Sequence, residues 1–410
     1  MRSLKFYFDE IMDESIIHTM STKSFLRYVE EFDEIPTRFR IEYLLSLSKM
    51  YEKEYRELKA LNKNYNRLLQ SVSRAASVGD LARIHADLNE VTADIFLRSG
   101  SIAEVHQRCT SYRDKLTFRI IALTSQQMRA EHGNPRGAFA WIRMGSTGRD
   151  EQTLYTDQDN LLVYKNKRDE PYYRAFAARM VTNLATIGFA RCRGNIMPTN
   201  DKWFGTLDEW KVKLHDYIVG SDNLIDLIVL SDAKYSGGNA ALAKQFLEET
   251  HTVMKMYQAS FKAIAKATLL MPIALTIFKG FKTEKKGEYK DMLNVKYKGW
   301  LPLIMLTLLF SLENDIWETN TIKRIKALEK LKVFEPDFAE GLMASYNILT
   351  GYKLMAQIDF LKGKTTSLTY YINPFKLEKR EQNRLKQALS TVEKFQRLAS
   401  SSYNINEDAL

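Results

Sequence analysis

The stretch Trp141–Tyr164, WIRMGSTGRDEQTLYTDQDNLLVY, decides the fold of this chain. A mostly apolar run over residues 139–144 indicates a buried strand, which ends at a glycine-serine turn. A second strand is predicted over residues 157–164. Because side chains alternate between the two faces of a strand, we expect Asp157 and Asp159 to point the same way.

These two aspartates form a candidate catalytic metal site. Carboxylates on one face repel each other unless a cation lies between them, and hard oxygen ligands suit Mg²⁺ or Mn²⁺ shared with substrate phosphates. Gly145 lacks a Cβ, so a triphosphate can approach the backbone there, where the Ser146 hydroxyl and the Arg149 guanidinium offer donors. The alternative interpretation is a solvated acidic loop before a strand.

A resemblance to a known family rests on these residues. Gly145-Ser146, ten intervening residues and Asp157-x-Asp159 resemble the signature of the DNA polymerase β-like nucleotidyltransferase superfamily. The longer string GSTGRDEQTLYTDQDN resembles one branch, the nucleotidyltransferase-like domain related to the N-terminal part of bacterial protein-PII uridylyltransferase. The resemblance covers about residues 70 to 398 and implies a nucleoside triphosphate substrate and a divalent metal.

A third carboxylate is expected from the apolar run Leu224–Leu230, which we predict to be a strand. An aspartate inside such a run is costly unless it is paired. Members of the superfamily carry a third acid on a neighbouring strand, so Asp226 is the candidate third metal ligand and general base. Family sequences often have an arginine two positions after this aspartate, where this chain has Ile228. Asp222 and Asp232 are predicted to be turn residues.

Further nucleotide contacts are expected from the loop that follows residue 188. Asn195, Asn200 and Lys202 are candidates to contact a base, sugar or phosphate, and Trp203 is a candidate to stack on a base. The alternative interpretation is a structural loop that caps the sheet. In the lysine-rich segment 279–298, the resemblance implies a lysine that reaches the triphosphate or the base, and a solvated basic loop is the alternative. The two lysines chosen are Lys290 and Lys296.

The predicted fold class is α+β, with a small mixed sheet between helical regions. In residues 41–69, apolar side chains recur every three or four positions, which indicates a helix that packs in an intramolecular bundle or forms a homodimer seam. The predicted regions are a helical N-terminal region (1–69), a nucleotidyltransferase-like domain (70–235, with a helical lead-in 70–131 and an α/β core 136–235), a helical C-terminal substrate-binding-type domain (239–398) and a frayed tail (399–410).

Composition narrows the class of protein. The chain has 410 residues, 45% of them hydrophobic, and a net charge of +10. Its lysines are widely spread without an aromatic-basic motif, so we do not expect nucleic acid as a partner. Cys109 and Cys192 lie far apart in the sequence, which favours neither a disulfide nor a zinc site.

The apolar stretches 267–278 and 300–310 are shorter than a bilayer span of about 20 residues. We expect a cytoplasmic protein without membrane segments.

The predicted reaction is transfer of UMP or AMP from a nucleoside triphosphate to a hydroxyl group. The resemblance implies a protein acceptor, such as a PII-like or other signalling protein, and hence a uridylyltransferase-like enzyme. A small-molecule acceptor is left open. The alternative is a non-catalytic nucleotide sensor, in which the same site binds the nucleotide and moves the helical regions.

Overall fold

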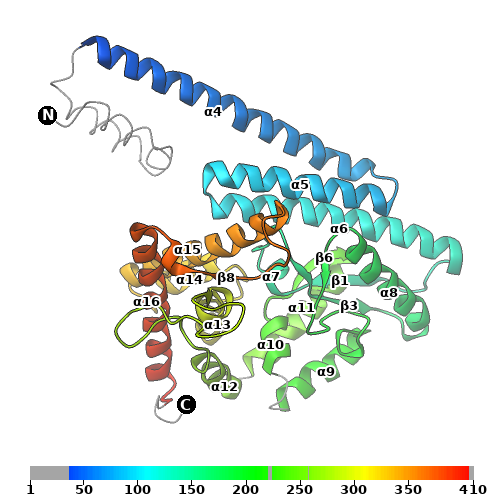
Figure 1. The fold of residues 1–410 in the computed structure, drawn as a ribbon. Coiled ribbons are helices and arrows are strands. Elements are labelled where there is room, and N and C mark those ends of the chain that lie inside the picture. Colours follow the sequence, from blue (N-terminus) through cyan, green and yellow to red (C-terminus); the bar gives the residue numbers. More distant parts are fainter. Residues whose placement is uncertain (1–36, 220–223, 257, 406–410) are drawn as a thin grey trace.

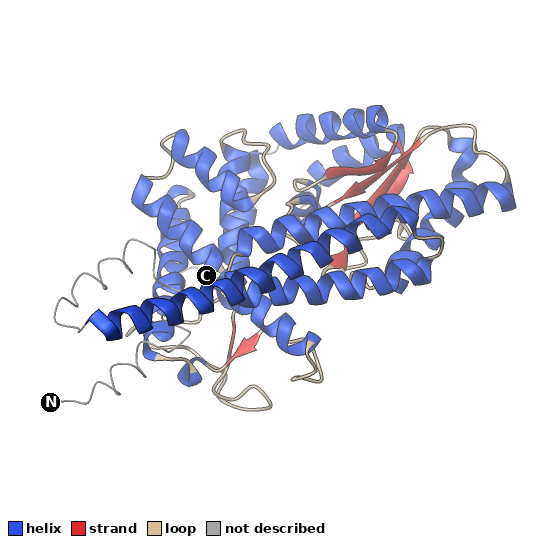
Figure 2. Ribbon diagram, turned by 90° about the horizontal axis from the view of Figure 1, so that it is seen from above, coloured by secondary structure: helices blue, strands red, loops and turns tan. Residues whose placement is uncertain are grey.

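The computed structural model describes residues 37–219, 224–256 and 258–405. Three long helices lie along one side of the molecule, a small sheet lies beneath them, and a helical bundle fills the remaining part (Figure 1). The longer strands gather in one region, and most of the rest is helical (Figure 2). The predicted α+β class is confirmed.

The central sheet has four strands in the order β5-β3-β1-β6. Strand β1 (Phe139–Arg143) runs antiparallel to both β3 (Asn160–Tyr164) and β6 (Lys234–Gly238). Strand β5 (Phe204–Thr206) runs parallel to β3. The sheet is therefore mixed, as predicted.

Alternate side chains of β1 and β3 enter two different hydrophobic cores. Trp141, Leu162 and Tyr164 belong to one core, which helices α6 (Ile102–His132) and α8 (Glu170–Thr186) help to form. Ala140, Ile142, Leu161 and Val163 belong to the other, with residues of α9 (Leu207–Val219), α10 (Leu224–Leu230) and α11 (Ala240–Lys255). Because both faces of the sheet are covered, both strands are apolar along nearly their whole length.

The first of the three long helices falls in the predicted helical N-terminal region, and the other two fall in the predicted lead-in. They are α4 (Thr37–Ser71), α5 (Val78–Ser99) and α6 (Ile102–His132). Ser101 caps α6, since its hydroxyl accepts a hydrogen bond from the backbone N–H of Glu104 at 3.3 Å. Such a cap satisfies one of the free N–H groups at a helix start.

The apolar stripe of α4 divides into two halves. Tyr65 and Leu68 are buried, so the C-terminal half packs within the chain as one interpretation predicted. Ile41, Leu45 and Tyr55 are exposed, with 53%, 55% and 60% of their surface accessible. The homodimer seam through residues 41–69 stays a prediction.

The predicted strand Leu224–Leu230 is wrong. These residues form helix α10, and the fourth strand of the sheet is instead β6, which begins four residues after the helix ends. A short apolar run has no periodicity that separates a buried strand from a buried helix. Leu227 and Leu230, one turn apart, are both buried in the second core.

The C-terminal bundle is helical, as predicted. Asn320 caps α14, where its side chain accepts from the backbone N–H of Lys323. The predicted frayed tail is wrong for residues 399–402, which continue the last helix with Ala399 fully buried; residues 406–410 lie outside the described part. The bundle helices are α12 (Gln258–Leu269), α13 (Leu301–Glu313), α14 (Thr321–Lys330), α15 (Pro336–Leu361) and α16 (Lys379–Ser402).

Shorter elements complete the fold. Within the described ranges, no helix combines the length and the apolar character needed to cross a bilayer. Both cysteines are free thiols. The remaining helices are α7 (Gly145–Gly148), α8 (Glu170–Thr186), α9 (Leu207–Val219), α10 (Leu224–Leu230) and α11 (Ala240–Lys255), and the remaining strands are β2 (Asp157–Gln158), β4 (Ala190–Arg191), β7 (Leu293–Asn294) and β8 (Tyr371–Ile372).

Candidate active site

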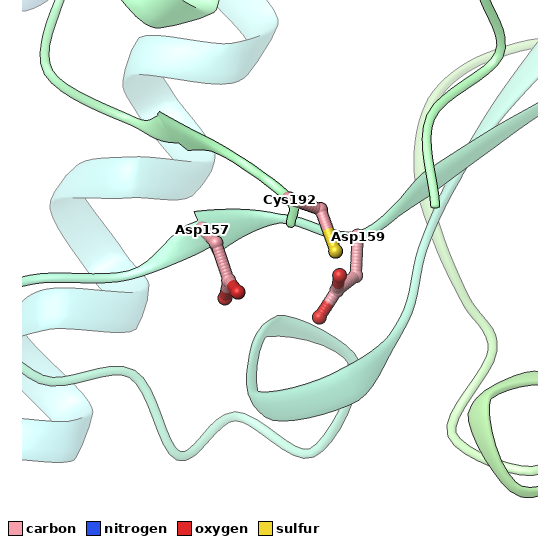
Figure 3. Close-up of side chains that lie close together, drawn as sticks. All are labelled: Asp157, Asp159 and Cys192. Carbon is pink, nitrogen blue, oxygen red and sulfur yellow. The ribbon is translucent and has the colours of Figure 1, made fainter. Parts of the chain in front are cut away.

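Asp157 and Asp159 point to the same side of the chain, with the Cys192 thiol beside Asp159 (Figure 3). One side-chain ligand atom from each of these three residues lies within 4.8 Å of the other two. The two aspartates do not share one continuous strand, because Asp159 lies between β2 and β3. Gln158 turns to the opposite side, where its amide donates to two backbone carbonyls, so the alternation expected from the sequence places the carboxylates together.

The electrostatics of this pair favour a bound cation. Burial and the nearby charge of Asp157 raise the pKa of Asp159 to about 7. A divalent cation would remove this repulsion, and two carboxylates are ligands that Mg²⁺ or Mn²⁺ prefers. Burial and the charge of Asp159 raise the pKa of the Cys192 thiol to about 12. The thiol therefore stays protonated and is a poor ligand for a hard cation.

The glycine-serine turn lies directly against the pair. Gly145 has φ +56°, and a Cβ at this position would lie 2.4 Å from Oδ2 of Asp159. Glycine is thus required both by the backbone conformation and by the close approach. The Ser146 and Thr156 hydroxyls are 3.2 Å apart, which links the turn to the residue before Asp157. The structure brings the predicted turn and the predicted acids together.

Arg149 lies in a buried ion-pair cluster rather than in a position to meet phosphate. Its guanidinium contacts Glu151 at 2.9 Å and Asp232 at 2.5 Å, and Asp232 also contacts Arg324 of α14 at 3.0 Å. Burial alone would lower the pKa of Arg149, but the charges of Asp232 and Glu151 raise it. This geometry gives Arg149 a structural role, so its predicted contact with phosphate lacks support.

Two segments of the chain match known families. Residues 86–223 match the family described as "Putative nucleotidyltransferase DUF294", and residues 258–403 match the one described as "Putative nucleotidyltransferase substrate binding domain". The chain belongs to the DUF294 nucleotidyltransferase family. A comparison with curated proteins gave no match.

In this nucleotidyltransferase, Asp226 does not join the acidic pair. It lies on helix α10, and its carboxylate accepts from the Lys202 ammonium at 2.8 Å. Its oxygens are not within 4.8 Å of both Asp157 and Asp159. The predicted role of Asp226 as third metal ligand depended on a strand, whereas residues 224–230 form a helix. The ion pair with Lys202 argues against that role, which stays a prediction.

Asp232 lies in a turn, as predicted, and is a buried acid that was not among the predicted site residues. It is 2% exposed and lies two residues before β6 begins. Its charge contributes to the raised pKa of Asp159. Lys234 stands two positions after Asp232, at the spacing where the resemblance implies an arginine after the third acid. The backbone carbonyl oxygen of Asp232 lies so close to Gly148 that a Cβ at position 148 would be 1.9 Å from it. The family match ends at residue 223, so it covers neither Asp226 nor Asp232.

The loop with Asn195 and Asn200 is held by hydrogen bonds within the loop. The Asn200 side chain accepts from the backbone N–H of Lys202 at 3.1 Å and donates to the carbonyl of Asn195 at 3.2 Å. Trp203 is 1% exposed in the second core, so the prediction that it stacks on a base is wrong. Nucleotide contacts by Asn195, Asn200 and Lys202 stay predictions.

The two lysines chosen from the basic segment have different surroundings. Lys290 is exposed in a loop, where its backbone N–H bonds to the carbonyl of Gly287. Lys296 lies beside Tyr370, with Nζ 5.3 Å from the ring centroid. The same ring faces Lys353 of α15, a buried lysine that no local sequence pattern distinguishes.

The loop from the glycine turn to Asp157 is held on both sides by other elements. From α6, His106 Nδ1 lies 2.9 Å from the carbonyl of Gln152, and its Nε2 lies 2.9 Å from the Tyr346 hydroxyl of α15. The C-terminal bundle adds direct bonds to Gly148, Arg149, Glu151 and Tyr155, made by Thr319, Asn320, Thr321 and Gln357. The bundle therefore helps to position the candidate site.

Proposed function

We propose that the chain transfers a nucleoside monophosphate, UMP or AMP, from a nucleoside triphosphate to a hydroxyl group of a protein. The observation that carries this proposal is the pairing of Asp157 and Asp159 on one side of the chain, against the Gly145 turn. Membership of a nucleotidyltransferase family supports the reaction class. The protein acceptor follows from the resemblance to protein-PII uridylyltransferase and is the finer part of the proposal.

Each part of the site has a task in this reaction. Asp157 and Asp159 would hold Mg²⁺ or Mn²⁺, which would neutralise phosphate charge that develops as the α-phosphorus is attacked. Gly145 leaves the backbone accessible, and the Ser146 hydroxyl donates to a phosphate oxygen. The contacts that α6 and the bundle make with the loop hold these groups in position. This positioning matters because small misplacements of reacting groups slow a reaction strongly.

The acceptor and the nucleotide can be tested together. Purified chain and Mg²⁺ are incubated with cell lysate and each of the four triphosphates in turn, and proteins are searched by mass spectrometry for a new nucleotidyl adduct. We expect one nucleotide to produce an adduct on a hydroxyl side chain of one protein. An adduct that forms equally well with the Asp157→Asn, Asp159→Asn variant contradicts the proposal.

A nucleotide sensor is the second candidate function. The bonds between the bundle and the loop from Gly145 to Asp157 favour it, since a nucleotide that moves this loop would also move the bundle. A sensor binds nucleotide without releasing pyrophosphate. Pyrophosphate release that depends on an acceptor protein therefore separates the enzyme from the sensor.

A further inference from the structure

Lys353 is held inside the C-terminal bundle against an aromatic ring. Its side chain is on α15, the residue is 7% exposed, and Nζ lies 3.2 Å from the centroid of the Trp300 indole. The indole N–H of Trp300 donates to the Thr350 hydroxyl at 3.0 Å, which fixes the ring. A cation over an indole face is a favourable contact, but it replaces only part of the hydration that burial removes.

A second lysine faces the same place. Lys296 and Lys353 have Nζ atoms 5.3 Å and 5.9 Å from the centroid of the Tyr370 ring. Throughout the described ranges, no carboxylate oxygen lies within 4.0 Å of either ammonium. Burial and the charge of Lys296 lower the pKa of Lys353 well below its usual value. Two amines close to one ring, with no carboxylate of the described residues beside them, would be stabilised by a bound anion.

This place adjoins the candidate active site. Gln357, one helical turn after Lys353, donates to the Tyr370 hydroxyl at 3.2 Å and also bonds to the backbone of Tyr155. Tyr155 precedes Asp157 by two residues. The charges of Glu151 and Asp157 both act on Lys353. An anion held by the two lysines would thus lie next to the proposed metal ligands.

We propose that Lys296 and Lys353 bind the polyphosphate of the nucleoside triphosphate from the side of the C-terminal bundle. This inference rests on the proposed function, because it takes the triphosphate as the ligand. Ammonium groups bind phosphate as point charges, and two of them offset the charge that the β- and γ-phosphates carry. The bundle then completes the nucleotide site instead of only supporting it.

The role of the lysines is tested by isothermal titration calorimetry, which measures the affinity of the full chain for inorganic pyrophosphate in the presence of Mg²⁺. Lys353→Met keeps an unbranched side chain, one atom shorter, and removes its charge; we expect it to weaken binding about ten-fold or more. Lys296→Met should also weaken pyrophosphate binding. The matched control is Lys386→Met, which removes a lysine 5.0 Å from the Phe281 ring on another part of the bundle and should leave the affinity unchanged.

Thermal unfolding of the same variants separates a binding role from a structural one. Removing a buried charge that lacks a counter-ion should leave the Tm of Lys353→Met equal to or above that of the wild type. A Lys353→Met chain that unfolds, or that binds pyrophosphate as Lys386→Met does, overturns the inference. Should the Lys353 variant yield no folded protein, an affinity loss in Lys296→Met would still show an anion site, but the assignment of Lys353 would be withdrawn.

Competition identifies the source of the phosphate. We expect pyrophosphate to compete with the triphosphate for the lysines. Simultaneous binding of pyrophosphate and triphosphate would overturn the assignment to the nucleotide and would indicate that the lysines bind a phosphorylated acceptor. The two proposals fail differently. Lysine-dependent pyrophosphate binding without any nucleotidyl adduct would refute the proposed function alone. Adduct formation by the wild type, with wild-type affinity in Lys353→Met, would refute this inference alone.

Discussion

Gln357 of the C-terminal bundle bonds to both backbone polar atoms of Tyr155. The backbone N–H of Tyr155 donates to Oε1 at 3.4 Å, and Nε2 donates to the Tyr155 carbonyl at 3.2 Å. These residues are 202 positions apart in the chain. Because Tyr155 lies two residues before Asp157, one side chain of the bundle fixes the backbone that enters the acidic pair.

Gln357→Ala should therefore reduce nucleotidyl transfer more than it reduces stability. The Gln357 side chain loses three hydrogen bonds, two to the Tyr155 backbone and one to the Tyr370 hydroxyl, which costs about 2–4 kcal/mol of unfolding free energy. The loop that carries Asp157 loses its support, so we expect transfer to fall about ten-fold or more. Gln387→Ala, on the exposed face of α16, is the control and should change neither. Wild-type transfer rates in Gln357→Ala would show that the bundle does not position the loop.

Asp226 and Asp232 should respond differently to the loss of their charge. Asp226 pairs with Lys202, whose side chain is 51% exposed, so Asp226→Asn should change stability by less than about 1 kcal/mol and leave transfer nearly intact. Asp232→Asn deprives Arg149 and Arg324 of a buried counter-charge and should reduce both stability and transfer. Label incorporation and urea unfolding of the two variants check this. A folded Asp226→Asn chain without activity would restore Asp226 as the third acid.

The buried cluster around Arg149 should be important for stability. Arg149→Met leaves Glu151 and Asp232 without their main partner in the interior, and breaking such a pair costs about 3–5 kcal/mol. Arg83→Met is the control, because Arg83 is 80% exposed and pairs with Asp80 on the surface. Urea denaturation measures both; similar midpoints for the two variants would contradict the role of the cluster.

His85 should make the protein less stable in acid. Its Nδ1 lies 2.6 Å from the carbonyl of Ile187, and burial lowers its pKa to about 3. The unfolded chain has the ordinary pKa of about 6.5, so it binds more protons below that pH. The stabilising contribution is complete above about pH 6.5 and is lost as pH falls towards 3. Between pH 7 and 4.5 the loss from this one group is about 2–3 kcal/mol.

A comparison with His85→Gln isolates this contribution from that of the carboxylates. Glutamine keeps a donor for the Ile187 carbonyl but does not titrate. We expect the unfolding free energy of the wild type to fall more steeply with acid than that of the variant. Parallel pH profiles would show that His85 has an ordinary pKa in the folded chain.

The sequence predicted those features that local pattern determines. The strand before Gly145, the long helices and the neighbourhood of Asp157 and Asp159 depend on periodicity and turn residues close in the chain. The run 224–230 was misassigned because a short apolar segment fits a strand or a helix equally well. The actual fourth strand, Lys234–Gly238, contains two glycines and no apolar run, so it carries little strand signal.

Other features depend on contacts between distant residues. Cys192 lies beside Asp159 because β4 pairs with β2. The aromatic and basic environment of Lys353 exists only when α15, Trp300 and Tyr370 are packed together. No spacing in the sequence distinguishes this lysine from the many on the surface. Tertiary packing, rather than local pattern, determines these parts of the site.

The measurement that tests the central claim most directly is incorporation of label from an α-labelled nucleoside triphosphate into an acceptor protein. The wild type with Mg²⁺ should transfer label, and removal of the metal with a chelator should stop it. The Asp157→Asn, Asp159→Asn variant should lose transfer by about 100-fold or more while its unfolding transition is retained. Transfer at the wild-type rate in that folded variant would contradict the account.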